Sequence, residues 1–172
     1  MTTRMLTISG LAKQFVLHLQ DSQRIDVFQS LDLTVDAGEC VVLGGQSGSG
    51  KSTLMRALYG NYKPTEGSIR IQHNGDAVEL VGAAPHVILD VRRTTLGYVS
   101  QFLRVIPRVT TLDIVAEPLI ALGTPEDEAK ERARTLLARL NLPEALWSLP
   151  PATFSGGEQQ RVNIARGFIR HY

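Results

Sequence analysis

The sequence predicts an α/β fold in which a phosphate-binding loop joins a buried strand to a helix. The loop, residues 44–53, fits the pattern G-x-x-x-x-G-K-[ST] with Gly45 and Gly50 as the fixed glycines. The apolar run before it, residues 40–43, is typical of a buried strand. Strand-like segments dominate the first half of the chain and helical spacing dominates the second, which supports a mixed α/β architecture.

Each residue type in this loop suits a triphosphate ligand. Small residues let successive backbone N–H groups face an anion, and the helix that starts near Gly50 adds the positive end of its dipole. Lys51 supplies a charge for the outer phosphates, Ser52 a hydroxyl ligand for Mg²⁺, and Thr53 a second hydroxyl. The alternative is a flexible Gly/Ser turn that happens to precede a helix. The predicted binding residues of the loop are Gly45, Ser47, Gly48, Ser49, Gly50, Lys51, Ser52 and Thr53.

Composition narrows the class of protein. With 172 residues and 43% hydrophobic residues the chain can build a core, and Lys+Arg 18 against Asp+Glu 17 gives no field that favours nucleic acid. The single Cys40 lies in the predicted strand, so we expect a small core residue. No signal peptide and no apolar run near the ~18 residues of a membrane span are found, so we expect a cytoplasmic protein whose membrane role, if any, comes through a partner.

The first half of the chain predicts an antiparallel layer that feeds the loop. Its expected strands are residues 5–9, 15–19, 24–28, 31–35 and 39–43. Phe15 has two interpretations of similar weight, stacking on an adenine ring or a place in the core. After the loop we expect a helix that ends at residues 59–61, and a hairpin around Asn74-Gly75.

The second half predicts a strand at residues 96–100 and then helices. That strand delivers Gln101, which can ligate Mg²⁺ and orient water, although a Gln in this position alone is more often an ordinary polar loop residue. The apolar and basic loop 102–108 favours a partner surface. Helical spacing then covers residues 112–122, where Pro118 should bend the helix, and residues 124–140.

The segment that begins at Ser155 predicts a helix start with two possible roles. Ser155 and Glu158 form a capping box for a helix with its core face on Val162, Ala165, Phe168 and Ile169. Alternatively, Gly156 and Gly157 leave N–H groups bare and make this helix start a second phosphate site. Two phosphate sites in one chain need two phosphates or two chains.

These segments together resemble an ATP-binding-cassette (ABC) ATPase. Residues 45–52 match the Walker A loop, residues 98–101 the Q-loop, and residues 155–158 with Gln160-Arg161 the signature motif. Phe15 falls near the family's adenine-stacking aromatic, while Phe154 and Glu158 stand where the commonest signature has Leu and Gln.

The resemblance implies a P-loop NTPase fold of ABC type, with an antiparallel β layer, a parallel core sheet and a helical subdomain. Residues 1–100 would form the nucleotide-binding part, and residues 101–172 the Q-loop, helical subdomain and signature helix of one domain, residues 1–172. It also implies ATP and Mg²⁺ as ligands, Lys51 and Gln101 as catalytic residues, and Ser52 and Gln101 at the metal. Each ATP would lie between Walker A of one chain and Ser155, Gly156, Gly157 and Glu158 of the other, in a head-to-tail homodimer or an ABC heterodimer.

Residues 98–108 and 154–168 most resemble the PhnL-type ATPase subunits of the bacterial carbon–phosphorus lyase system, which breaks down phosphonates. This resemblance implies carbon–phosphorus lyase subunits as partners and a role in forming ribose 1-phosphonate 5-triphosphate. The first alternative is the ATP-binding subunit of an ABC transporter, with residues 102–120 coupled to a membrane protein. The second alternative is a non-catalytic nucleotide-binding fragment.

The family continues past its signature into a Walker B strand with its Asp, a catalytic Glu, a D-loop and a switch His. No Asp or Glu lies in an apolar strand-like run after the signature of this chain. We therefore expect a domain truncated at its C-terminus, missing strands that flank the Walker A strand, with little ATP hydrolysis of its own.

Overall fold

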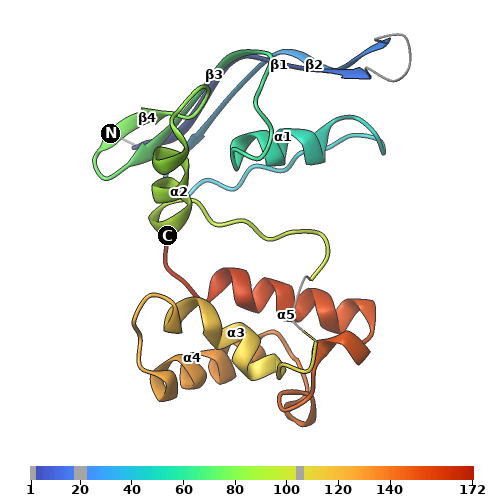
Figure 1. The fold of residues 1–172 in the computed structure, drawn as a ribbon, viewed down its shortest axis with the longest axis vertical. Helices are drawn as coiled ribbons and strands as arrows, with labels where there is room; N and C mark the ends of the chain where they lie inside the picture. Colours follow the sequence, from blue (N-terminus) through green and yellow to red (C-terminus); the bar gives the residue numbers. More distant parts are fainter. Residues whose placement is uncertain (1–2, 18–22, 104–106) are drawn as a thin grey trace. The chain divides into compact units, whose positions relative to one another are not determined.

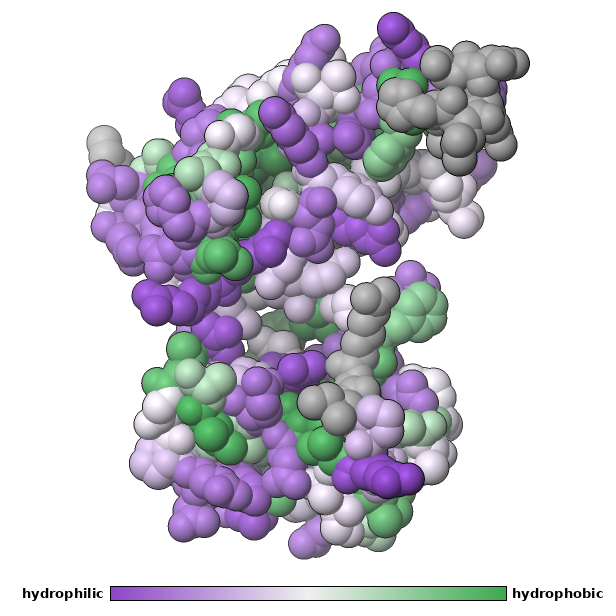
Figure 2. Space-filling view, viewed as in Figure 1, coloured by the Kyte–Doolittle hydropathy of each residue, from purple (hydrophilic) through white to green (hydrophobic). Residues whose placement is uncertain are grey.

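A computed structural model describes residues 3–17, 23–103 and 107–172 (Figure 1). The chain forms two units, Met1–Leu96 and Gly97–Tyr172. Among the described residues, no helix is long and apolar enough to cross a membrane. Hydrophilic and hydrophobic residues are interspersed on the visible face of each unit (Figure 2).

The first unit is built on an antiparallel sheet of order β2-β1-β3-β4. Its strands are β1 (Arg4–Leu17), β2 (Gln23–Asp36), β3 (Glu66–His73) and β4 (Asp76–Glu79). The turn between β3 and β4 has Asn74 at φ 51° and Gly75 at φ 94°, as a tight turn of two left-handed residues requires. The antiparallel layer and the Asn-Gly hairpin predicted from the sequence are confirmed.

The strands β1 and β2 are longer than the sequence predicted. The expected break at Gly10 is a bulge: Gly10 has φ 55°, and the pairing with β2 shifts register between Ile8 and Leu11. A bulge absorbs one extra residue and lets the strand continue, so one strand replaces two expected ones. Residues 18 and 19 of the predicted strand 15–19 lie outside the described residues.

Two helices, α1 (Lys51–Leu58) and α2 (Pro85–Thr94), cover one face of this sheet (Figure 1). The core between them is formed by Ile8, Leu11, Leu54, Ala57, Ile69, Ile71, Leu80 and Val91. Fully burying one Leu or Ile side chain stabilises the fold by about 1.5–3 kcal/mol, so this core fixes α1 and the loop before it on the sheet. The predicted end of the helix near Tyr59 is confirmed.

The predicted strands 39–43 and 96–100 are wrong for the described structure, where both segments are irregular. Val42 is 86% exposed, and Cys40, expected in the core, is exposed as well. A buried strand needs neighbours for its backbone hydrogen bonds and covers for both faces. The described strands pair only in the antiparallel sheet, so these segments lack such a neighbour.

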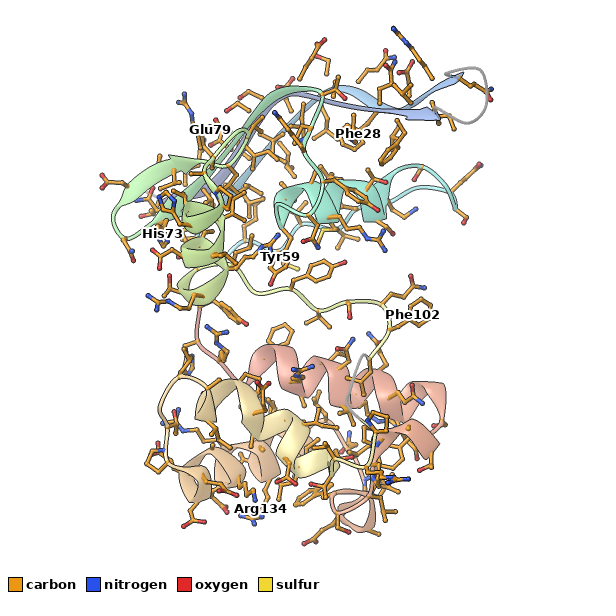
Figure 3. All side chains as sticks on the ribbon, in the orientation of Figure 1. Phe28, Tyr59, His73, Glu79, Phe102 and Arg134 are labelled. Atoms are coloured by element: carbon orange, nitrogen blue, oxygen red, sulfur yellow. The ribbon has the colours of Figure 1, made fainter. Side chains whose placement is uncertain are left out.

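His73, which ends β3 beside the Asn74-Gly75 turn, is buried at 8% exposure (Figure 3). Its Nδ1 lies 2.7 Å from Thr95 Oγ1 and its Nε2 lies 3.1 Å from Asp90 Oδ2. These contacts attach the end of β3 to α2 and the residue after it.

The second unit is helical, with α3 (Thr111–Ile120), α4 (Glu126–Arg139) and α5 (Gly156–Phe168), joined by short 3₁₀ turns η1 (Glu144–Leu146) and η2 (Pro151–Thr153). All three predicted helices are confirmed, and Pro118 lies inside the last turns of α3. The three helices share a core in which several positions are alanine. Its residues are Ile114, Val115, Ala116, Leu119, Ala129, Ala133, Leu137, Leu142, Phe154, Val162, Ala165 and Ile169.

Candidate nucleotide-binding site

The start of α1 is an open helix end. Gly50 is the N-cap, with a left-handed backbone at φ 87°, and no side chain caps the first turn in the described residues around it. The first turn also carries no acidic residue. Its backbone N–H groups and the positive end of the helix dipole are therefore available to an anion.

Glycine is required at this point by packing as well as by backbone conformation. A Cβ added at Gly50 would lie 2.7 Å from Val27 Cγ1 and 3.4 Å from Phe28 Cδ1. Both neighbours belong to β2, so the loop lies directly against the sheet. This close approach gives a physical reason for the second fixed glycine of the sequence pattern.

The ammonium group of Lys51 is hydrogen-bonded within the loop. Lys51 Nζ donates hydrogen bonds to the carbonyl oxygens of Gly45 at 2.8 Å and Gln46 at 2.7 Å, and to Ser49 Oγ at 3.2 Å. The charge is thereby placed at the mouth of the loop, where the oxygens of a phosphate would find it. Ser47 and Ser52 are exposed and Thr53 is half-buried, so the hydroxyls predicted to face a nucleotide and its metal are close to the surface.

A shallow pocket of about 180 Å³ adjoins the loop. Its walls are the loop, Leu43 just before it, and apolar side chains of β2 and α1. Phe28 of β2, labelled in Figure 3, is one of them. The full lining is Phe28, Leu31, Leu43, Gly44, Ser49, Gly50, Lys51 and Leu54.

Phe15 lies on the strand next to the one that packs on the loop. In the sheet Lys13 pairs with Phe28, and Phe15 pairs with Ile25. The Phe15 ring is half-buried, and the core cluster of the described first unit does not include it. Of the two interpretations left open by the sequence, this position favours a base contact, and the contact itself stays a prediction.

Gln101 is exposed and belongs to the second unit, at a position fixed by α5. Asn163 Nδ2 of α5 donates a hydrogen bond to the carbonyl oxygen of Ser100, and Ser100 Oγ donates to the carbonyl oxygen of Phe102 at 2.7 Å. Asn163 is 8% exposed. The sequence analysis did not predict that Asn163 holds the backbone at Ser100. The one signal for it in the sequence is an amide side chain on the apolar side of a helix, next to Val162.

The start of α5 is closed by its own side chains. Ser155 Oγ accepts a hydrogen bond from the Glu158 amide at 3.4 Å, and Glu158 Oε2 accepts one from the Ser155 amide at 2.8 Å and one from Ser155 Oγ at 2.7 Å. Hydrogen bonds from the Ser155 hydroxyl, and then from its amide, hold the pKa of Glu158 below its ordinary value. The predicted capping box is confirmed, and the phosphate role of Gly156 and Gly157 stays a prediction.

Two aromatic side chains of the second unit, Phe102 and Phe168, are exposed. Phe168, expected in the core, is 69% exposed, because it ends α5 and the buried face passes through Asn163 and Ile169 instead. In the loop 102–108, Phe102 is 72% exposed, as a partner surface would require, while residues 104–106 lie outside the described residues.

No group of three or more His, Cys, Asp or Glu side chains gathers around a possible metal position in the part of the chain that the structure describes. Ser52 and Gln101 belong to different units, so their joint contact with Mg²⁺ stays a prediction. An ion at Ser52 would take its other ligands from phosphate oxygens and water, as Mg²⁺ commonly does.

The first unit carries a Walker A loop, with an open helix end, on an antiparallel sheet. The second unit is helical and has a capped Ser-Gly-Gly-Glu helix start. Together these features define the class of ATP-binding cassettes. The chain belongs to the ABC transporter family, whose model matches residues 28–172.

Relatives and solved structures agree with this family. The lipoprotein-releasing system ATP-binding protein LolD of Syntrophotalea carbinolica is 39% identical over 165 residues, which cover 96% of this chain and 69% of that protein. The macrolide export ATP-binding/permease protein MacB 1 of Aeromonas hydrophila is 36% identical over 96% of this chain and 24% of its own length. The dimeric post-hydrolysis structure of the cassette MJ0796 bound to ADP and Pi aligns with TM-score 0.84 and 30% identity, over 96% of this chain and 69% of that chain.

These findings confirm the ABC-type fold class and correct one prediction. The relatives are named as transporter ATP-binding proteins, so they favour the transporter alternative over the carbon–phosphorus lyase reading of residues 98–108 and 154–168. The two stretches share the family's Q-loop and signature, and such shared motifs do not separate one ABC subfamily from another.

Proposed function

We propose that this chain acts as the ATP-binding subunit of an ABC transporter. The observation that carries the proposal is the open start of α1, with Lys51 Nζ 2.8 Å from the Gly45 carbonyl oxygen. The first-turn N–H groups and the ammonium would bind the phosphates, Ser52 would reach the Mg²⁺ ion, and Phe15 would contact the base. The contacts predicted for Gln101, with Mg²⁺ and with water, remain part of this proposal.

The start of α5 would serve the nucleotide of a second cassette. One chain offers two helix starts with glycines, and a head-to-tail dimer would place one against the other across each nucleotide. The cassette MJ0796 is described as dimeric in its complex with ADP and Pi, which supports this arrangement. A homodimer and a heterodimer with another cassette are equally compatible with it.

The partner would be a membrane permease. LolD is named for a lipoprotein-releasing system, and MacB 1 is named as a fused ATP-binding and permease protein. The exposed side chain of Phe102 offers an apolar contact for such a partner.

Binding competition tests the phosphate part of this proposal. ATP with Mg²⁺ is titrated into the protein by calorimetry, and the titration is repeated with tripolyphosphate or adenosine present. We expect tripolyphosphate to compete with ATP and adenosine to compete weakly. ATP binding that tripolyphosphate leaves unchanged would contradict the proposal.

Cell fractionation tests the partner. A tagged chain expressed in its native host should be recovered with the membrane fraction and an integral permease. Recovery in the soluble fraction, without an integral permease, would contradict the transporter role.

A further inference from the structure

Four side chains of the first unit form a continuous series of contacts that begins at Phe15. The rings of Phe15 and Tyr62 meet edge to face, with centroids 5.6 Å apart and an interplanar angle of 84°. Arg56 Nη1 donates a hydrogen bond to the Tyr62 hydroxyl at 2.8 Å. On Phe15 itself, Lys13 Nζ lies 4.7 Å from the ring centroid.

This series connects the candidate base site to the candidate phosphate site. Arg56 lies in the last turn of α1, and Lys51 begins the same helix. Lys13 is held in turn by a hydrogen bond from its Nζ to the carbonyl oxygen of Lys63 at 2.8 Å, in the segment that follows Tyr62. The orientation of Phe15 is therefore tied at two points to the loop that leaves α1.

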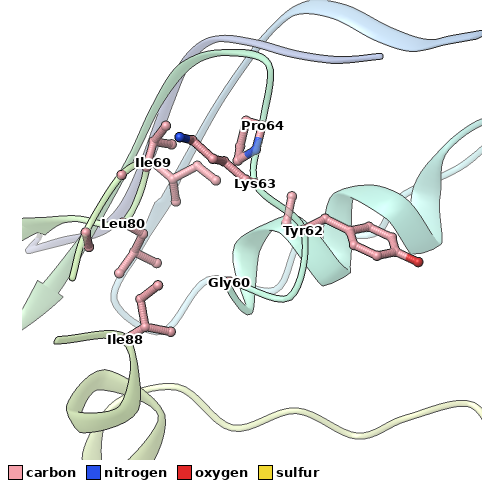
Figure 4. A pocket seen from close by; sticks show the side chains of 11 residues that line it. Gly60, Tyr62, Lys63, Pro64, Ile69, Leu80 and Ile88 are labelled. Atoms are coloured by element: carbon pink, nitrogen blue, oxygen red, sulfur yellow. The ribbon is translucent and has the colours of Figure 1, made fainter. Parts of the chain in front are cut away.

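The direction of the Tyr62 side chain argues against a role in core packing. Tyr62 lines an apolar pocket of about 230 Å³ together with Ile69, Leu80 and Ile88. In Figure 4 its ring points along α1 and away from these three side chains. The ring is thus directed to Phe15 and Arg56 instead of the core.

We propose that Tyr62 is a positioning residue for the nucleobase, which rests on the proposed nucleotide function of the loop. An edge-to-face pair fixes the plane of each ring, so Tyr62 holds Phe15 in one orientation before a base arrives. A base that stacks on a fixed ring does not have to order that ring, and affinity rises accordingly. The cationic groups of Lys13 and Arg56 beside the two rings suit a polyanionic nucleotide.

The test separates base contacts from phosphate contacts. The dissociation constants of ATP and tripolyphosphate are measured for the wild type, Tyr62→Leu and Tyr62→Phe. Because an edge-to-face pair has a modest strength, we expect Tyr62→Leu to weaken ATP binding by about 3- to 10-fold and to leave tripolyphosphate unchanged. Tyr62→Phe, which keeps the ring and loses the Arg56 hydrogen bond, should fall between Tyr62→Leu and the wild type.

A double-mutant cycle with Phe15→Ala supplies the decisive control. If Tyr62 acts through Phe15, Tyr62→Leu should weaken ATP binding no further once Phe15 is removed. A Tyr62→Leu protein that melts earlier but keeps the wild-type ratio of ATP to tripolyphosphate affinity would overturn the inference, and so would additive losses in the cycle.

The two affinities of the wild-type protein distinguish failure of this inference from failure of the function on which it rests. Equal affinities for ATP and tripolyphosphate would show that the base makes no contact, so the inference would fail while the phosphate site stands. Failure to bind either ligand would remove the proposed function and the inference together.

Discussion

The helices α1 and α5 both begin in glycine-containing segments, yet their starts are opposite in character. At α1 the N-cap is Gly50, the first residue is a lysine, and no side chain among the described residues caps the turn. At α5 the N-cap is Ser155, and the carboxylate of Glu158 completes the capping box. One helix start presents bare N–H groups with a cation, and the other has its own anion in place.

The difference indicates an order of binding. A phosphate at α1 meets first-turn N–H groups that no described side chain caps, and no carboxylate in the first turn opposes it. Lys51 Nζ would exchange its hydrogen bonds within the loop for bonds to the phosphate oxygens. A phosphate at α5 meets the carboxylate of Glu158, so binding there needs help from a second set of contacts. We infer that α1 supplies the primary site and that α5 can serve only a nucleotide already held by another chain.

The largest expected effect is on Lys51. Lys51→Ala should weaken ATP binding by about 1.5–3 kcal/mol, the usual contribution of a charge-assisted hydrogen bond. Adenosine, which has no phosphates, should bind as before. Calorimetric titration of both ligands checks this, with Ser155→Ala as the matched change at the other helix start and no expected loss of ATP affinity. Equal losses for ATP and adenosine would make Lys51 a structural residue.

A matched pair of glycine substitutions compares the two starts directly. Gly50→Ala puts a Cβ 2.7 Å from Val27 Cγ1 at a residue with φ 87°, and strain of this kind costs about 1–3 kcal/mol. No atom of the described residues lies within 4 Å of a Cβ added at Gly156, so Gly156→Ala should be neutral or stabilise the helix by about 0.4–1 kcal/mol. Denaturant unfolding measures both. A Gly156→Ala protein that is the less stable of the two would refute the comparison.

The sequence correctly predicted the features whose causes are local. A Walker A pattern, an Asn-Gly turn and a capping box each depend on residues within a few positions of one another. The helix that ends near Tyr59, the hairpin at Asn74-Gly75 and the cap at Ser155 were therefore predicted with their correct places.

The sequence could not predict features that depend on distant neighbours. The apolar run at Val42 has strand composition, but a strand exists only where another strand pairs with it. His73 is buried by Asp90 and Thr95, which follow it by 17 and 22 positions. Asn163 reaches Ser100 across 63 positions, and the spacing of α5 gave no sign of a partner for its amide.

A smaller effect is expected from the cap of α5. Ser155→Ala removes the hydroxyl that accepts from the Glu158 amide at 3.4 Å, and loss of an N-cap side chain costs about 0.5–2 kcal/mol of stability. Ser155→Asp keeps a hydrogen-bond acceptor at the N-cap, so it should lose less stability than Ser155→Ala. Thermal unfolding monitored by circular dichroism compares the three proteins. If both variants matched the wild type, the cap would contribute no stability.

The smallest effect is a pH dependence that only the capped helix should show. Hydrogen bonds from the Ser155 hydroxyl, and next from its amide, lower the pKa of Glu158 in the folded protein from the ordinary value of 4.5. Because the folded pKa is the lower one, the carboxylate stabilises the fold above the unfolded pKa, and this contribution is lost as pH falls through the folded pKa.

Nuclear magnetic resonance titration of the Glu158 carboxyl carbon measures this directly. In Ser155→Ala the hydroxyl donor is gone while the backbone N–H remains, so the pKa of Glu158 should move part of the way back to 4.5. Glu158→Gln is the control, because an amide closes the box without a proton to gain and should remove the pH dependence of the α5 start. A pKa of Glu158 that stays the same in Ser155→Ala would show that the hydroxyl does not stabilise the carboxylate. The contrast between the two helix starts would then rest on Gly50 and Lys51 alone.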